Sequence, residues 1–149
     1  MKIVRHSARA ILIDDDARLV TIKRTRPGQA LYWTTPGGGI EPDDVSREAT
    51  AERELAEELG AVVRIGPQVF LATTPWGDGV QVQHFFLARL INIDEALRTG
   101  PEYDDPNRGT YELDRIALDD LPGLPLRPIQ VREFVIANTA ALLADLPAV

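Results

Sequence analysis

The sequence predicts a single domain of the α+β (α/β) class, in which helices cover a mixed β-sheet, and three observations support this prediction. The chain has 149 residues, which is the usual length of one domain. Hydrophobic residues make up 44% of it and charged residues 26%, as in globular proteins that bury their own core. Most apolar runs are short and β-branched, and one early and one late segment have helical spacing. We therefore expect residues 1–149 to form one domain.

The first predicted element is a β-hairpin. Residues 8–13 and 18–23 are apolar, β-branched runs that flank the acidic segment 14–16. Two such runs around a short polar turn are typical of a hairpin. The three aspartates could also suggest a calcium loop, but the glycine and the terminal glutamate of such loops are missing.

The next predicted elements are a short strand, a glycine turn and a helix. Residues 31–35 are rich in aromatic and β-branched side chains, and the segment 36–39 (Pro-Gly-Gly-Gly) ends this strand. Asp44 or Ser46 can cap a helix that stops at Gly60.

The second half of the chain is predicted to consist of strands followed by a helix. Strands are expected over three apolar stretches, residues 61–73 (with a break at 66–67), 80–93 and 110–118. Turns or loops are expected in two segments rich in proline, glycine or polar residues, 74–79 and 98–109. A short helical turn is expected at 119–122, and Pro128 suits the start of a last helix that continues to about Leu146.

Three carboxylates on the early helix are the first sign of chemistry. Glu54, Glu57 and Glu58, the glutamate triplet, stand at i, i+3 and i+4 and therefore share one face. Like charges at this spacing destabilise a helix, so the arrangement invites a compensating cation. Carboxylate oxygens suit a hard ion such as Mg²⁺ or Mn²⁺. The alternative is an acidic face that is simply solvated.

A run of glycines lies shortly before this helix. Without side chains, residues 37–39 let the backbone approach a ligand or metal closely. Their N–H groups could also meet phosphate oxygens. A flexible turn is the alternative, but the glycines and the glutamate triplet together indicate a metal–phosphate site.

This stretch resembles the Nudix box, G-x5-E-x7-R-E-U-x-E-E-x-G-U, in which U is aliphatic. The matching positions are Gly38, Arg53, Glu54, Leu55, Glu57, Glu58 and Gly60, and Trp33 and Pro36 precede the glycines as in many family members. The chain departs from the pattern at three points. Asp44 stands in place of a glutamate, eight residues instead of seven separate it from Arg53, and the final aliphatic position is filled by the small residue Ala61.

The resemblance implies a Nudix hydrolase with the αβα sandwich of that family. Such enzymes use Mg²⁺ or Mn²⁺ to cleave a nucleoside diphosphate linked to another moiety, by attack of water on phosphorus. It implies that the Gly37 carbonyl and the glutamate triplet bind metal, and that Arg53 holds the carboxylates by ion pairing. The catalytic residues would be Glu54, Glu57 and Arg53. The general base would be Glu54, Glu57 or an acid from a loop.

Further residues are expected near the substrate. The candidates for substrate binding are Gly38, Gly39, Trp76, Arg24, Asp105 and Glu112. A distant acid often joins the site in this family, so Asp104, Asp105 and Glu112 are candidates, with solvated loop positions as the alternative. Tyr103, Tyr111 and Trp76 could stack on a base. Trp33 is expected at the edge of the core, and His84 within it.

The overall balance of residues argues against two classes of partner, although a local basic pocket is compatible with it. The net charge of −7 argues against nucleic-acid binding, and no run approaches the roughly 20 apolar residues of a membrane span. The absence of cysteine fits a reducing cytoplasm, so we expect a cytoplasmic protein that binds a nucleotide. The N-terminal strand or the C-terminal helix could serve a homodimer. A non-catalytic nucleotide-binding or protein-interaction module of the same fold remains the alternative function.

Overall fold

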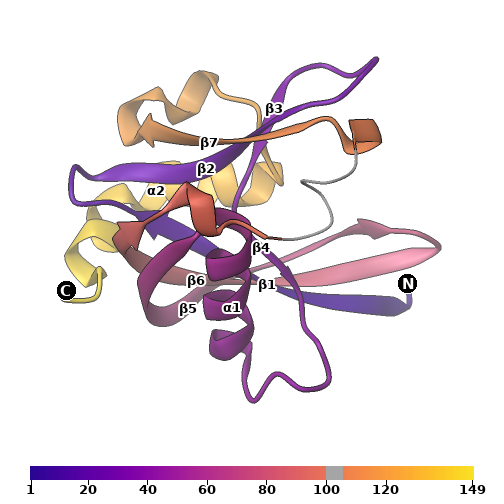
Figure 1. Cartoon of the computed structure of the whole chain (residues 1–149), viewed down its shortest axis with the longest axis horizontal. Helices are drawn as coiled ribbons and strands as arrows, with labels where there is room; N and C mark the ends of the chain where they lie inside the picture. The colour runs from indigo at the N-terminus through magenta and orange to yellow at the C-terminus, as the bar shows by residue number, and fades with distance from the viewer. Residues whose placement is uncertain (100–105) are drawn as a thin grey trace.

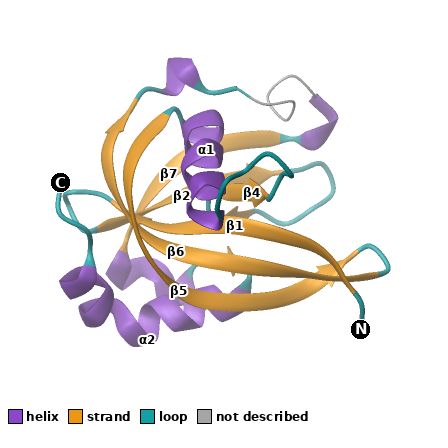
Figure 2. Cartoon of the chain, turned by 90° about the horizontal axis from the view of Figure 1, so that it is seen from below, coloured by secondary structure: helices purple, strands orange, loops and turns teal. Residues whose placement is uncertain are grey.

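The computed structural model of the chain describes residues 1–99 and 106–149. Two α-helices, α1 (Arg47–Leu59) and α2 (Ile129–Asp145), cover opposite faces of one curled β-sheet (Figure 1, Figure 2). The predicted fold class, a mixed sheet between helices, is therefore confirmed.

The sheet contains parallel and antiparallel strand pairs. Its strands are β1 (Ile3–Ile13), β2 (Arg18–Thr25), β3 (Tyr32–Thr34), β4 (Gly37–Gly39), β5 (Ala61–Trp76), β6 (Gly79–Ile93), β7 (Thr110–Ala117) and β8 (Leu126–Arg127). Hydrogen-bonded neighbours follow the order β5-β6-β1-β2-β3-β8, with β4 paired to β1 and β7 to β2. β1 runs parallel to β6, and β3 parallel to β8. The central strand β1 therefore contacts strands from three separate parts of the chain.

The predicted hairpin is confirmed, and Asp14 holds its turn together. The carboxylate of Asp14 accepts hydrogen bonds from the N–H groups of Asp16 and Arg18 at 2.9 Å. It also accepts one from the side chain of Arg115 at 3.1 Å. The two backbone bonds satisfy donors of the turn, and the bond from Arg115 ties the turn to β7.

The three glycines form a strand, so the predicted turn at this position is wrong. Gly37 stands opposite Arg9 of β1, and Gly39 stands opposite Ser7. A Cβ atom at Gly37 would lie 2.4 Å from the carbonyl oxygen of Ala8. The absence of side chains thus lets β4 pair closely with β1, a long-range contact that local turn signals do not reveal.

β5 is longer than predicted and runs without a break through Gly66 and Pro67. Its register against β6 shifts between Ile65 and Gln68, which accommodates the proline on this edge strand. The strand continues to Trp76, so this tryptophan ends a strand instead of lying within a turn.

Two apolar clusters lie on the two faces of the sheet. One contains Leu55 and Leu59 of α1 packed against even-numbered residues of β1, such as Leu12. The other contains Val131 of α2 packed against odd-numbered residues, such as Ile11. The alternation along β1 follows from the two-residue period of a strand. Among the helices of the described residues, none combines the length and apolar character needed to cross a bilayer.

His84 of β6 is buried, as predicted, and it pairs with His6 of β1. The Nδ1 atom of His6 lies 3.1 Å from Nε2 of His84, and the two rings stack with centroids 5.3 Å apart. Gln68 Nε2 lies 3.3 Å from the other ring nitrogen of His84. Burial, with smaller contributions from Arg47 and His6, lowers the pKa of His84 to about 4.

This histidine should make the stability of the protein depend on pH. Between the ordinary pKa of 6.5 and the folded pKa of about 4, the unfolded state binds the proton more readily, so acidification in this range destabilises the fold. Above pH 6.5 both states are neutral and the effect disappears. We expect the unfolding free energy of the wild type to decrease as the pH is lowered from 6.5 to about 4. In His84→Gln this decrease should be smaller. Denaturant titrations at several pH values test this, and an unchanged pH dependence would contradict it.

Candidate functional site

Helix α1 carries the glutamate triplet, and both of its ends are capped as predicted. Ser46 Oγ accepts a hydrogen bond from the Ala49 N–H at 3.0 Å, and Gly60 ends the helix with a φ of 66°. The buried side of the helix consists of Thr50, Ala51, Leu55 and Leu59. The glutamate triplet lies beside this stripe and is only partly exposed. The helical period therefore brings all three carboxylates to the edge of the core.

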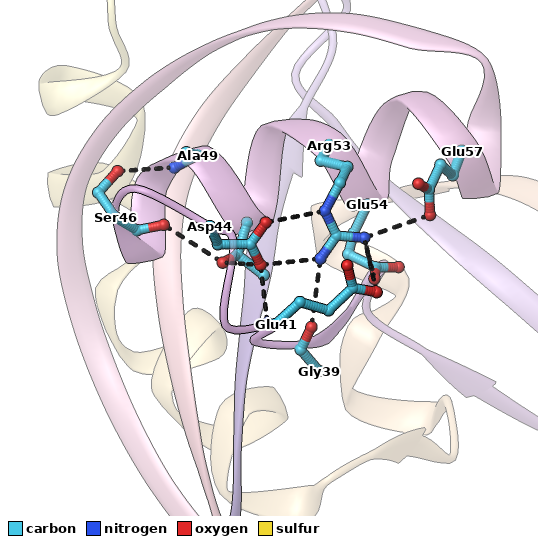
Figure 3. Close-up of polar contacts among 9 residues, drawn as sticks. Gly39, Glu41, Asp44, Ser46, Ala49, Arg53, Glu54 and Glu57 are labelled. Atoms are coloured by element: carbon cyan, nitrogen blue, oxygen red, sulfur yellow. Dashed lines mark hydrogen bonds and ion pairs between the residues drawn. The ribbon is translucent and has the colours of Figure 1, made fainter.

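Arg53 lies at the centre of the polar contacts around α1 (Figure 3). Its Nε and Nη2 atoms donate to the two carboxylate oxygens of Asp44 at 3.0 and 2.9 Å, which is a bidentate pair. Its Nη1 atom donates to Glu54 at 2.9 Å and lies 3.4 Å from a Glu57 oxygen. Nη2 also donates to the Gly39 carbonyl at 3.3 Å. One guanidinium thus connects the preceding loop, the glycine strand and two carboxylates of the triplet.

Asp44, which departs from the family pattern, holds Arg53 in this position. Its carboxylate also accepts hydrogen bonds from the Glu41 N–H at 2.8 Å and from the Thr50 hydroxyl at 2.7 Å. The Arg53 guanidinium, followed by these two donors, holds the pKa of Asp44 well below its usual range. The same pairing raises the pKa of Arg53. The Asp44 carboxylate is therefore fully ionised at neutral pH.

Replacing Asp44 by Asn should loosen Arg53 and lower kcat/KM by roughly 10–100-fold, the cost typical of outer-shell changes at metal sites. Because its folded pKa is depressed, Asp44 stabilises the fold above its ordinary pKa of 3.8, and this contribution is lost as pH falls below that value. The stability difference between wild type and Asp44→Asn should therefore shrink in acid. Steady-state kinetics and denaturant titrations measure both effects. The exposed neighbour Asp43, changed to Asn, is the control, and equal losses in both variants would contradict the role of Asp44.

The glycine strand and α1 fit closely together. The Gly37 N–H donates to Glu58 Oε1 at 3.0 Å. A Cβ atom at Gly38 would lie 2.4 Å from the carboxylate carbon of Glu54. Gly38 therefore makes the room that the Glu54 carboxylate occupies. The contact shown at Gly37 is through its N–H, and metal binding by its carbonyl stays a prediction.

The glutamate triplet opens onto a cleft of about 1070 Å³. Glu41 and the triplet supply its negative charge. Arginines supply its positive charge. They come from β1, from β2 and the loop after it, from the 3₁₀ turn Pro106–Arg108, and from β8. These arginines are Arg5, Arg9, Arg24, Arg26, Arg108 and Arg127. Carboxylates and guanidinium groups in one cleft suit a ligand that combines a cation with phosphates.

Arg9 of β1 stands directly opposite Gly37 of the glycine strand. Its Nη1 atom donates to the Thr35 carbonyl at 2.8 Å, and its Nε atom is buried without a partner. Burial lowers the pKa of Arg9, and the charges of Glu58 and Glu54 oppose this shift. A cation with unused donor capacity therefore lies beside the carboxylates.

Two predicted substrate-binding residues, Arg24 and Trp76, line the cleft. Arg24 is buried, and it donates to the carbonyls of Thr110 at 3.2 Å and Arg108 at 2.7 Å. Its guanidinium also lies 3.6 Å from the centre of the Tyr111 ring. It therefore connects β2 with β7 as well as facing the cleft. Gly38 and Gly39 line the cleft as well.

The predicted distant acids have a different outcome. Asp104 and Asp105, together with Tyr103, lie outside the described residues. Glu112 is exposed on β7, whereas its neighbour Tyr111 lines the cleft, because successive side chains of a strand point to opposite faces. Participation of these acids in the site stays a prediction.

The donors that line the cleft fit a hard divalent cation. Carboxylates and a backbone carbonyl are the oxygen donors that Mg²⁺ prefers, and the glycine strand leaves space for the Glu54 carboxylate. Within residues 1–99 and 106–149, no three His, Asp or Glu side chains form a ready-made cation cage. Arg53 and the Gly37 N–H instead contact the triplet in this structure.

The sequence patterns did not indicate several residues that line the cleft. They lie at alternate positions of two strands, Arg5 and Arg9 on β1 and Gln81 and Gln83 on β6. The signal that could have revealed them is polar side chains repeating every second residue within otherwise apolar strands. Trp33, in contrast, packs at the edge of the α2-side core as predicted.

Known proteins resemble this chain in sequence and in fold. A family model described as the NUDIX domain matches residues 4–130. The chain is 29% identical over 142 residues to the ADP-ribose pyrophosphatase of Bacillus subtilis (strain 168), a match that covers 93% of this chain and 71% of that protein. It is 38% identical over 61 residues to the CTP pyrophosphohydrolase of Escherichia coli (strain K12), a match that covers 40% of this chain and only 44% of that protein.

Solved structures share the fold. The E. coli ORF135 protein superposes with a TM-score of 0.69 at 23% identity, over 95% of this chain and 94% of that one. A Caenorhabditis elegans Ap4A hydrolase superposes with a TM-score of 0.70 at 17% identity, over 95% and 98%. Because the NUDIX model spans most of the chain and includes both β4 and the glutamate triplet of α1, this chain belongs to the Nudix domain family.

Proposed function

We propose that the chain is a pyrophosphohydrolase, dependent on Mg²⁺ or Mn²⁺, that cleaves a nucleoside diphosphate linked to another moiety. The observation that carries the proposal is the glutamate triplet of α1 in one cleft with arginines from β1, β2 and β8. Carboxylates attract a cation, and guanidinium groups attract phosphate oxygens. The relatives, a CTP pyrophosphohydrolase and an ADP-ribose pyrophosphatase by name, support a nucleotide as the substrate.

The residues of the chain would divide the work between binding, orientation and proton transfer. A divalent cation, when bound, would offset the charge of the diphosphate and make water a stronger acid. The glutamate triplet would hold it, and Arg53 would orient Glu54 and Glu57 through their ion pairs. Glu54 or Glu57 would accept the proton of the attacking water. Arg9 would bind phosphate oxygens through its unused donor.

The proposal is tested with purified protein and a panel of nucleotides. The panel contains normal and oxidised nucleoside triphosphates, ADP-ribose, a dinucleoside polyphosphate and nucleotide sugars. We expect hydrolysis of at least one of them with Mg²⁺ or Mn²⁺, its loss in EDTA, and its recovery when the metal is added back. Hydrolysis that persists in EDTA would contradict the metal dependence. Nucleotide binding without hydrolysis of any panel member would contradict catalysis and favour a binding module.

A further inference from the structure

One face of the sheet changes from apolar to polar inside the cleft. We call this patch the polar floor. Arg5 of β1, Gln81 and Gln83 of β6, and Thr74 and Trp76 of β5 line the cleft, and the fully buried Ser7 of β1 lies beside them on the same face. Strand pairing sets Arg5 and Thr74 opposite Gln81, and Ser7 opposite Gln83, so these side chains share a face. Farther along the same strands this face holds the apolar residues that pack on α2. Figure 2 shows these strands extending past α2 toward the N-terminus.

The polar floor has hydrogen-bonding capacity that the described residues leave unused. Gln81 is 7% exposed and Ser7 is 0% exposed, yet Gln81 Oε1 and Ser7 Oγ have no hydrogen-bond partner. Two of the other buried side-chain atoms without a partner, Arg9 Nε and Thr35 Oγ1, belong to residues that line the cleft together with Gln81. Buried polar groups are normally paired, so this concentration indicates a place where a polar ligand completes the bonding.

The side chains of the floor combine a flat surface with a hydrogen-bonding edge. The Arg5 guanidinium lies 4.0 Å from the centre of the Trp76 ring, and both planar groups face the cleft. Gln83 is oriented by its Nε2 atom, which donates to Thr74 Oγ1 at 2.9 Å. A planar heterocycle could stack on this surface while its edge meets the amide of Gln81.

The unpaired atom of Gln81 decides between phosphate and base. Phosphate oxygens at neutral pH only accept hydrogen bonds, so they could pair with the Gln81 Nε2 group but would leave its buried Oε1 atom without a donor. The exocyclic amino group of a nucleobase is a donor, and side-chain amides pair well with such edges. The floor is therefore better suited to a base than to a phosphate.

We propose that the polar floor binds the nucleobase of the substrate, with Gln81 Oε1 accepting a hydrogen bond from its exocyclic amino group. The site would thus favour cytosine over uracil, and adenine over hypoxanthine. The inference rests on the proposed function for the position of the phosphates beside the glutamate triplet. The contacts to the base involve other residues, those of the polar floor.

Binding of nucleoside monophosphates tests the inference, because these ligands have no phosphoric anhydride bond to cleave. Calorimetric titration in Mg²⁺ compares CMP with UMP, and AMP with IMP, which differ at one amino or oxo position. We expect each amino ligand to bind roughly tenfold more tightly than its oxo partner. Equal affinities within a pair, or no binding at millimolar concentration, would overturn the inference.

Three variants locate the effect. Gln81→Met should reduce the preference to less than about twofold and leave the thermal midpoint unchanged or higher, because an apolar isostere replaces an unpaired polar group. Gln130→Met is the matched control, since Gln130 lines the cleft from the start of α2, and it should keep the preference. Trp76→Leu should weaken all four ligands by a similar factor, because stacking does not depend on the base edge. A preference that survives Gln81→Met would overturn the assignment.

The outcomes separate this inference from the proposed function. Metal-dependent hydrolysis of panel nucleotides without any amino preference would leave the function standing and overturn the inference. An amino preference in monophosphate binding without hydrolysis of any panel member would support the inference and contradict the function.

Discussion

Replacing Glu57 by Gln is expected to lower kcat by more than about 100-fold while the protein remains folded. The Glu57 side chain is 44% exposed and its oxygen lies 3.4 Å from Arg53, so this ion pair contributes little to stability. A neutral amide, however, cannot supply the negative charge with which the triplet would hold a divalent cation. Changes to groups that only support metal ligands already cost roughly 10–100-fold, so a direct donor should cost more. Steady-state kinetics on the best panel nucleotide and thermal unfolding measure the two effects.

Two further variants make this result specific. Glu58→Gln removes the charge but keeps an amide oxygen that can accept from the Gly37 N–H, so its fold should be unaffected while its rate falls similarly. Glu52→Gln removes an exposed carboxylate from the same helix, outside the cleft, and should keep the wild-type rate. Wild-type rates in both Glu57→Gln and Glu58→Gln would show that the metal site is assigned to the wrong residues.

The second large effect concerns alanine substitutions at two neighbouring glycines. One should lower the rate and the other should lower the stability. In Gly38→Ala the new Cβ would lie 2.4 Å from the Glu54 carboxylate carbon, at the flexible end of a side chain. We expect Glu54 to move aside at little cost in stability. Displacement of a positioned group by about 1 Å can cost roughly 100-fold in rate, and we expect a loss of that order here. Kinetics and the thermal midpoint of Gly38→Ala give both numbers.

Gly37→Ala should instead damage the fold. Gly37 has a φ of 146°, and a Cβ there would lie 2.4 Å from the Ala8 carbonyl oxygen and 2.6 Å from the Arg9 Cα, which are backbone atoms. Strain of this kind costs about 1–3 kcal/mol, so the midpoint of unfolding should fall. Equal stability losses in the two alanine variants, or a wild-type rate in Gly38→Ala, would contradict the distinction between a strained backbone and a displaced carboxylate.

Local patterns in the sequence were sufficient for most elements of the fold. The acidic turn at Asp14, the cap at Ser46 and the stop at Gly60 act through neighbours a few residues away, so they could be recognised without knowing the rest of the chain. The errors fall where distant pairing overrides a local signal. Gly37–Gly39 is a strand because β1 lies beside it, and Gly66 and Pro67 stay within β5 because a register shift on an edge strand accommodates them.

The sequence alone also determined one side of the candidate site. Arg53 and the glutamate triplet lie within two turns of one helix, and the helical period places them together whatever surrounds the helix. The tertiary structure decided the rest. Pairing of Arg5 in β1 with Gln81 in β6 brings together residues far apart in the chain, and only strand register selects such neighbours. The face of α1 that carries Arg53 and the glutamate triplet could therefore be predicted from periodicity, whereas the polar floor proposed to bind the base depends on the pairing of distant strands in the folded sheet.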